Sequence, residues 1–128
     1  KKLIKKKIKI LIWAPFISKV GTVNNVINSA YSLQKFSKKK IFEILLINST
    51  GEWKSYKDEL CDKGLNLVDF FNLKAFNKFK KEGFIKSRLA YMFIFLVSFF
   101  PLFKYLKKEK PDFLNIYLVT SLPLILFT

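Results

Sequence analysis

Short apolar runs alternate with segments of helical spacing along most of this sequence, and that alternation limits the possible folds more than any other feature. The runs occupy residues 8–14, 41–47 and 65–71, and each has the length and residue types of a strand. Apolar residues recur at helical spacing over residues 23–36, and a polar helix is expected over residues 53–62. The pattern predicts an α/β fold: a parallel sheet with right-handed crossovers and helices on both faces.

A fourth strand is predicted over residues 113–119. Pro111 cannot lie inside a helix and ends the basic segment before it, and the near-continuous apolar pattern that follows is typical of a buried parallel strand. Thr120 and Ser121 have hydroxyls suited to capping a helix after this strand. Because ligands of open α/β sheets bind outside the carboxyl ends of the strands, we expect Tyr117, Thr120 and Ser121 to face a ligand. For Tyr117, simple packing is the alternative interpretation.

A long helix is predicted over residues 84–110, and its middle, residues 89–103, contains no charge. A transmembrane helix needs about 20 apolar residues, whereas this run is shorter and contains Pro101, which is expected to kink it. Three interpretations stay open: a crossover helix packed on the sheet, an interfacial helix that touches lipid, and a membrane span.

The segment between the first strand and the first helix, residues 18–26, is a predicted binding loop. Gly21 permits a ligand to approach the backbone, and Thr22, Asn24 and Asn25 can form side-chain hydrogen bonds with phosphate or sugar groups. The segment has neither the Gly-x-Gly-x-x-Gly spacing of a dinucleotide site nor the Gly-Lys-Ser/Thr of a P-loop. A single glycine that makes a turn beside a capped helix is the alternative.

The chain is strongly basic, with 24 Lys and Arg against 9 Asp and Glu and a formal net charge of +15. Arg88 is the only arginine, and lysine supplies undirected charge suited to anionic surfaces, whereas readers of nucleic acid commonly use arginine for base contacts. We therefore expect an anionic membrane surface as a partner and no nucleic acid. The composition of an A/T-rich genome and solvated helix faces are the alternative origin of this charge.

The residue types present limit the chemistry. The sequence has no histidine, the commonest general base, and its single cysteine, Cys61, cannot form an intrachain disulfide. We expect a cytoplasmic protein without a cofactor or a metal. Asp58, Glu59 and Asp62 fall on the polar helix and Asp112 at a strand start, so these carboxylates are predicted to lie at the surface and not to form an acid–base pair.

The first strand, Gly21 to Val26 at a helix start, and KPDFLNIYLVTSLPL at the fourth strand together resemble the amino-terminal half of a family-four glycosyltransferase. Such enzymes have two facing Rossmann-like domains, the GT-B architecture, and carry sugars from nucleotide-sugar donors to acceptors. The resemblance extends over most of the chain. It implies that residues 1–128 are a truncated, Rossmann-like, acceptor-side domain, and that the carboxyl-terminal donor-binding domain is absent from this sequence.

The resemblance also implies a function: transfer of a sugar to a saccharide or lipid-linked acceptor at the cytoplasmic face of the plasma membrane. Gly21 and Thr22 match the family's glycine loop, which approaches the donor phosphates. The sequence has Tyr117 where the family often has histidine, and Val20 where it often has a second glycine. The fragment alone is expected to be inactive. The alternative is a non-enzymatic basic module that binds membranes or nucleic acid by charge.

Overall fold

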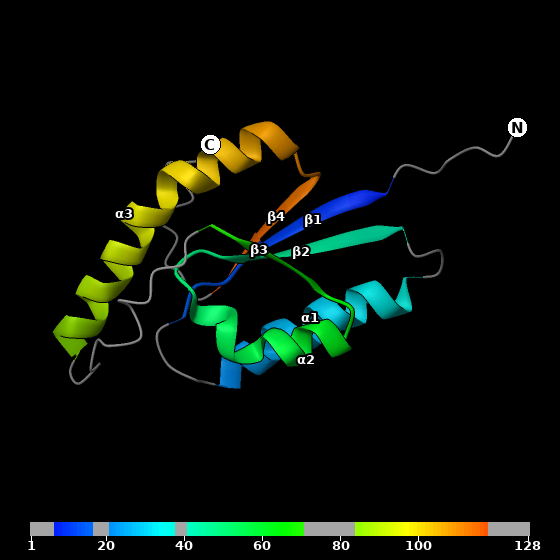
Figure 1. The fold of residues 1–128 in the computed structure, drawn as a ribbon, viewed down its shortest axis with the longest axis horizontal. Helices are drawn as coiled ribbons and strands as arrows, with labels where there is room; N and C mark the ends of the chain where they lie inside the picture. Colours follow the sequence, from blue (N-terminus) through cyan, green and yellow to red (C-terminus); the bar gives the residue numbers. More distant parts are fainter. Residues whose placement is uncertain (1–6, 17–20, 38–40, 71–83, 118–128) are drawn as a thin grey trace, which may run out of the picture.

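The computed structural model describes residues 7–16, 21–37, 41–70 and 84–117. This part of the chain contains a four-stranded, all-parallel sheet in the order β3-β2-β1-β4 (Figure 1). The strands are β1 (Ile8–Trp13), β2 (Phe42–Asn48), β3 (Asn66–Asp69) and β4 (Phe113–Ile116). The predicted α/β fold, a Rossmann-like parallel sheet with helices, is confirmed.

Helices lie on both faces of the sheet, as the alternation predicted (Figure 1). On one face lie α1 (Gly21–Phe36), the short 3-10 helix η1 (Glu52–Tyr56) and α2 (Lys57–Asp62), and on the other lies α3 (Phe84–Glu109). The polar helix expected over residues 53–62 is thus present as η1 followed by α2. Gly64 ends α2 with a φ of 66°, and the Leu65 N–H donates to the Leu60 carbonyl at 2.9 Å, which is the hydrogen bond of a Schellman cap.

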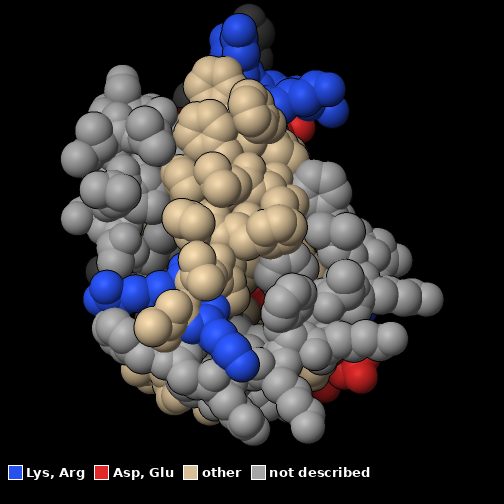
Figure 2. All heavy atoms as spheres, turned by 90° about the vertical axis from the view of Figure 1, so that its left-hand side faces the viewer, with Lys and Arg blue, Asp and Glu red and all other residues tan. Residues whose placement is uncertain are grey.

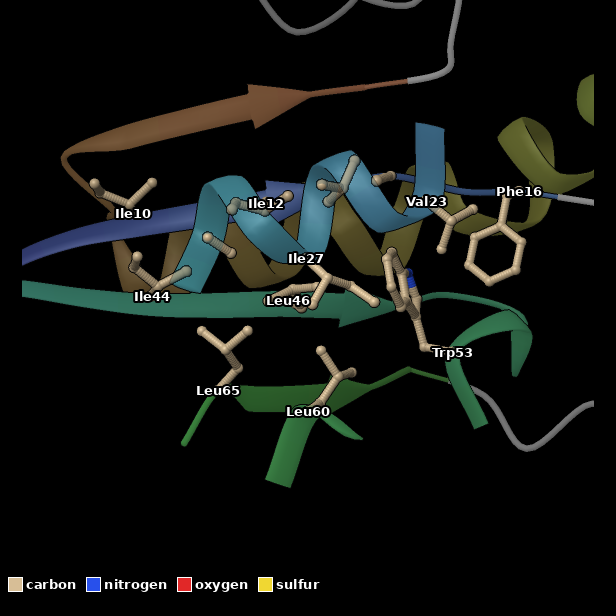
Figure 3. Packing of buried hydrophobic residues seen from close by; sticks show 13 residues of the cluster. Ile10, Ile12, Phe16, Val23, Ile27, Ile44, Leu46, Trp53, Leu60 and Leu65 are labelled. Atoms are coloured by element: carbon tan, nitrogen blue, oxygen red, sulfur yellow. The ribbon is translucent and has the colours of Figure 1, made fainter. Parts of the chain in front are cut away.

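The strands divide the core into two layers because successive side chains point to opposite faces of a sheet. Ile10, Ile12, Ile44 and Leu46 face α1 and α2, where they pack in a cluster that also contains Trp53 (Figure 3). The intervening residues of the same strands face α3. They are Leu11, Trp13, Leu45 and Ile47, and all four are buried with Leu102 of α3.

The position of β4 differs from the prediction of a buried strand. β4 is at the end of the strand order and pairs with β1 alone, so its side chains are only half-buried and Phe113 is 58% exposed. An apolar strand sequence does not distinguish a central position from an edge position, which is why the pattern overestimated burial. The predicted continuation through residues 118–119 and the helix expected after it lie outside the described residues.

The structure shows that residues 84–109 form a helix that crosses over the sheet, as the first of the three interpretations predicted, while the contact with lipid and the membrane span stay predictions. α3 runs from Phe84 to Glu109 with Pro101 inside it, and it connects β3 to β4 across the sheet. Ile94, Ser98 and Leu102, spaced four residues apart, are its buried side chains. Residues 88–109 are also long and apolar enough to cross a membrane, by length and composition alone.

Candidate functional site

The strand order defines a topological switch point between β1 and β4. From β1 the chain crosses to β2 and then β3 on one side, and after α3 it returns to β4 on the other side of β1. In open α/β sheets the crevice at such a reversal, outside the carboxyl ends of the two strands, is where ligands bind. The two ends are adjacent here, because the Tyr117 N–H donates to the Trp13 carbonyl at 3.0 Å. We call this edge the β1–β4 rim.

Gly21 is the first residue of α1, the helix that follows β1. The prediction placed it in a loop, and the structure makes it and the residues up to Val26 helical. A Cβ built on Gly21 meets no heavy atom within 4 Å, and its φ is not in the left-handed region. Neither packing nor backbone geometry therefore requires glycine at this position.

The other predicted residues of this segment lie on the first two turns of α1. Thr22, Asn24 and Asn25 are exposed, while Val23 and Val26 are buried against the sheet. The first turn of α1 contains no acidic residue, so no side-chain carboxylate there offsets the positive end of the helix dipole. An exposed hydroxyl and two exposed amides beside that end form a surface that could bind an anion or a sugar.

Tyr117 follows β4 directly and lies at the rim, as predicted. Its side chain is half-buried and packs against the cluster on the α1 face, so it is on the same side of the sheet as Gly21. Tyr117 therefore packs against the core, and its position at the rim is also compatible with ligand binding. Thr120 and Ser121, the other predicted residues of this segment, lie outside the described residues.

Trp53 is a residue of this region that the sequence did not single out. Its side chain is fully buried, and the centroid of its ring lies 4.9 Å from that of Phe16, a residue that follows β1. Figure 3 shows it beside Val23 of the first turn of α1. The indole Nε1 is buried and has no hydrogen-bond partner in the described part of the chain. An indole N–H is a donor that usually finds a partner when it is buried, so Trp53 offers an unused donor beneath the start of α1.

A second polar group lies at the end of β2, where the prediction placed only a turn. The Glu52 carboxylate accepts the backbone N–H of Ser49 at 3.3 Å and of Thr50 at 2.7 Å, and both hydroxyls at 3.0 and 2.8 Å. Asn48 is fully buried, donates to Asp69 and accepts the Trp53 N–H at 3.1 Å. The sequence signal was Ser49-x-x-Glu52, the spacing of a capping box. These polar groups form hydrogen bonds with one another and stabilise the turn.

The remaining predictions concern residues away from the rim. Asp58, Glu59, Cys61 and Asp62 are exposed on α2, as expected, and Asp112 is exposed and accepts the Lys9 N–H at 2.8 Å. Within the described ranges, no three acidic or cysteine residues lie together in a way that could hold a metal ion.

The described residues also form a hollow of about 510 Å³ at the opposite edge of the sheet, where α1 ends and β2 begins. Its lining consists of Ser29, Ser32, Leu33, Phe36, Ser37 and Phe42. None of the predicted site residues belongs to it, so the β1–β4 rim is the better candidate.

Comparison with known proteins gives no relative: no protein-family model, no curated protein and no solved structure matches this chain.

Proposed function

We propose that this chain is the acceptor-side domain of a GT-B glycosyltransferase, which transfers a sugar from a nucleotide-sugar donor to a saccharide or lipid-linked acceptor at the cytoplasmic membrane face. The observation that carries the proposal is the switch point between β1 and β4. Of the two segments on which the resemblance rests, the one that contains Tyr117 ends at that rim, and the one that begins at Gly21 opens α1, the helix that follows β1.

The chemistry asked of this domain is binding and orientation. The start of α1 would face donor phosphates, because its N–H groups and dipole favour negative charge and the open space at Gly21 lets a ligand approach the backbone. Thr22, Asn24 and Asn25 would hydrogen-bond sugar hydroxyls, with Tyr117 on the β4 side of the crevice. The proposed reaction displaces a nucleoside diphosphate from the sugar without a metal, and the donor-binding domain would supply the remaining contacts. The catalytic residues are unknown.

The test is a transfer assay with the full-length protein, including the domain proposed to follow. A panel of labelled nucleotide-sugars is incubated with membrane acceptors, and transfer is measured for the wild type and for Gly21→Val and Tyr117→Ala. We expect each variant to lower kcat/KM at least tenfold, because Gly21→Val fills the space beside the helix start and Tyr117→Ala removes a wall of the crevice.

The matched control is Ser32→Val, which places the same side chain on the exposed face of α1 about three turns from Gly21. It should transfer sugar at the wild-type rate. Folding of all variants is checked by thermal unfolding. The proposal is wrong if the full-length protein transfers no sugar from any donor, or if both rim variants keep the wild-type kcat/KM.

The exposed apolar face of α3, described below, favours one alternative, a non-enzymatic module that binds membranes by charge and apolar contact. That alternative predicts vesicle binding by the full-length protein with no turnover of any nucleotide-sugar.

A further inference from the structure

The outer face of α3, directed away from the sheet, is apolar and exposed. Phe100 is 76% exposed and Ile85 is 72% exposed, values far from those of a core helix. The large apolar side chains exposed on this helix are Ile85, Leu89, Met92, Phe93, Leu96, Phe100 and Phe103. We call this set the α3 stripe.

The α3 stripe is narrow and continuous. With 3.6 residues per turn, its side chains fall within an arc of about 100° around the helix. The buried residues Ile94, Ser98 and Leu102 lie on the opposite side of the helix, and Leu102 packs with Leu11 and Trp13 of the sheet face. α3 therefore has two apolar sides, and the sheet covers one of them.

Cations lie at both ends of the α3 stripe. Lys86 and Arg88 precede its centre, and Lys104, Lys107 and Lys108 follow it; all five are exposed. The one acid of α3, Glu109, is paired with Lys9 at 2.9 Å. Figure 2 shows this face as a strip of uncharged residues with Lys and Arg side chains toward both ends.

We infer that α3 docks in the plane of an anionic membrane surface, with the α3 stripe in the boundary between headgroups and acyl chains and its flanking cations on the headgroups. The ligand class is an anionic lipid bilayer. An apolar stripe together with a basic flank supplies the two signals that stable peripheral binding requires. The inference deepens the membrane part of the proposed function, and its test needs no sugar transfer.

Charge favours a bilayer over a second copy of the chain. A two-fold contact through the α3 stripe would place the same surface on both partners, so two sets of five cations would meet across one interface. The net charge of +15 adds a repulsion of the same sign. An anionic lipid surface would instead attract both the five cations and the net positive charge of the chain.

The packing of α3 favours an in-plane position over a span. Leu102 is fully buried with the strand residues of this face, and the ring centroids of Trp13 and Phe95 lie 6.4 Å apart. Crossing a bilayer would remove α3 from this contact and expose the sheet face beneath it. Docking through the α3 stripe leaves the contact intact.

Vesicle flotation with the full-length chain tests the inference. Vesicles of phosphatidylcholine alone are compared with vesicles that contain phosphatidylglycerol, at low and at high salt. We expect binding to the anionic vesicles at low salt and weaker binding in high salt. The double variant Leu96→Ser/Phe100→Ser should lower the partition coefficient at least tenfold, and Lys107→Ser about fivefold.

Two matched controls distinguish binding through the α3 stripe from nonspecific apolar and electrostatic binding. Phe36→Ser removes a phenylalanine that is 73% exposed on α1, on the other face of the sheet. Lys57→Ser removes an exposed lysine of α2, also on that face of the sheet. Both controls should bind anionic vesicles as the wild type does.

Fluorophore labels distinguish docking from spanning. In a Cys61→Ser background, labels on Lys86→Cys and on Lys107→Cys should both be quenched by a membrane-impermeant quencher added outside the vesicles. A label on Leu96→Cys should be shielded. Quenching of only one helix end would show a span and overturn the inference.

The remaining outcomes are equally decisive. Absence of binding to anionic vesicles, equal loss with Phe36→Ser, or a dimer that the Leu96→Ser/Phe100→Ser variant abolishes would each overturn the inference. Sugar transfer by a protein that does not bind vesicles would leave the proposed activity standing and the docking refuted. Vesicle binding without sugar transfer would support the docking and refute the proposed activity.

Discussion

The two faces of the sheet are built from the same strands but are covered in different ways. On one face, α1 buries Val23, Val26, Ile27 and Ala30 and turns mostly polar residues outward. On the other face, α3 buries a single row of residues and keeps large apolar side chains on its outer side. A helix with one apolar stripe belongs to the surface of a soluble fold, whereas a helix that is apolar all round indicates a second contact. This difference is the basis of the proposal that α3 docks on a membrane surface.

The largest expected effects test whether both faces belong to one cooperative fold. Ile27→Ala on the α1 face and Leu102→Ala on the α3 face each truncate a fully buried side chain, and each should lower the free energy of unfolding by about 2–5 kcal/mol. Urea unfolding followed by circular dichroism measures both. If Leu102→Ala lowers the free energy of unfolding by less than about 1 kcal/mol, α3 is not anchored to the sheet. The α3 face would then contribute less to stability than the structure indicates.

Gly51→Ala is expected to have the next largest effect, at the turn after β2. Gly51 has a φ of 87°, a left-handed conformation that costs an L-residue about 1–2 kcal/mol. The same loss should appear in the free energy of unfolding. Gly21→Ala is the matched control, because Gly21 has open space around it and no positive φ, and it should not destabilise the fold. Equal losses for the two variants would show that the left-handed backbone at Gly51 is not the cause.

Ser98→Ala probes the contact between α3 and the sheet, and here a gain is expected. The Ser98 hydroxyl is fully buried and has no hydrogen-bond partner among the described residues. Removal of an unsatisfied buried hydroxyl should raise the free energy of unfolding by about 1 kcal/mol. Ser32→Ala, at an exposed position of α1, should change it by less than about 0.5 kcal/mol. A destabilised Ser98→Ala variant would mean that the hydroxyl is satisfied in solution.

The smallest expected effect concerns the ion pair that joins the end of α3 to β1. The hydrogen bond between Lys9 and Glu109 raises the pKa of Lys9 and lowers the pKa of Glu109. A carboxylate with a lowered pKa stabilises the fold above its unfolded pKa of about 4.3, and that contribution is lost as the pH falls through the folded pKa. Glu109→Gln should therefore lower the unfolding temperature slightly at pH 7.

The pH dependence of this difference tests whether the ion pair causes it. The difference in unfolding temperature between Glu109→Gln and the wild type should shrink below pH 4, where the carboxylate protonates. It should also shrink in high salt, because the pair is partly exposed and screened. A difference that stays constant from pH 7 to pH 3 would show that the ion pair is not its cause.

The alternation of strand and helix patterns was sufficient to predict the class of fold. β-branched runs such as residues 41–47 and the spacing of Val23, Val26 and Ile27 are local signals, because each reports which face of its own element is buried. The strand order was not predicted. That β4 lies beside β1, and at an edge, depends on contacts between residues about 100 positions apart, which local patterns do not record.

The candidate site was predicted in part. Tyr117 was assigned to the end of the fourth strand and directly follows β4, whereas Gly21, assigned to a loop, is the first residue of α1. The prediction for Thr120 and Ser121 stays a prediction. The buried Trp53 nitrogen was missed because the burial of one indole depends on α1, β2 and Phe16 together. The outer face of α3 was also ambiguous, since a helix that is apolar all round does not show which side meets the sheet.

The short connection between α3 and β4 restricts the angle between the helix and the sheet. Only Lys110, Pro111 and Asp112 separate the two elements, and Lys9 contacts both Glu109 and Asp112, so the helix cannot pivot freely. The carboxyl end of β1 meets α3 at Phe95 and its amino end meets Glu109, which places the rim alongside the first half of the helix. Whatever plane α3 rests on, the β1–β4 rim is held at a fixed inclination to it. A substrate drawn from that plane would reach the rim from a single direction.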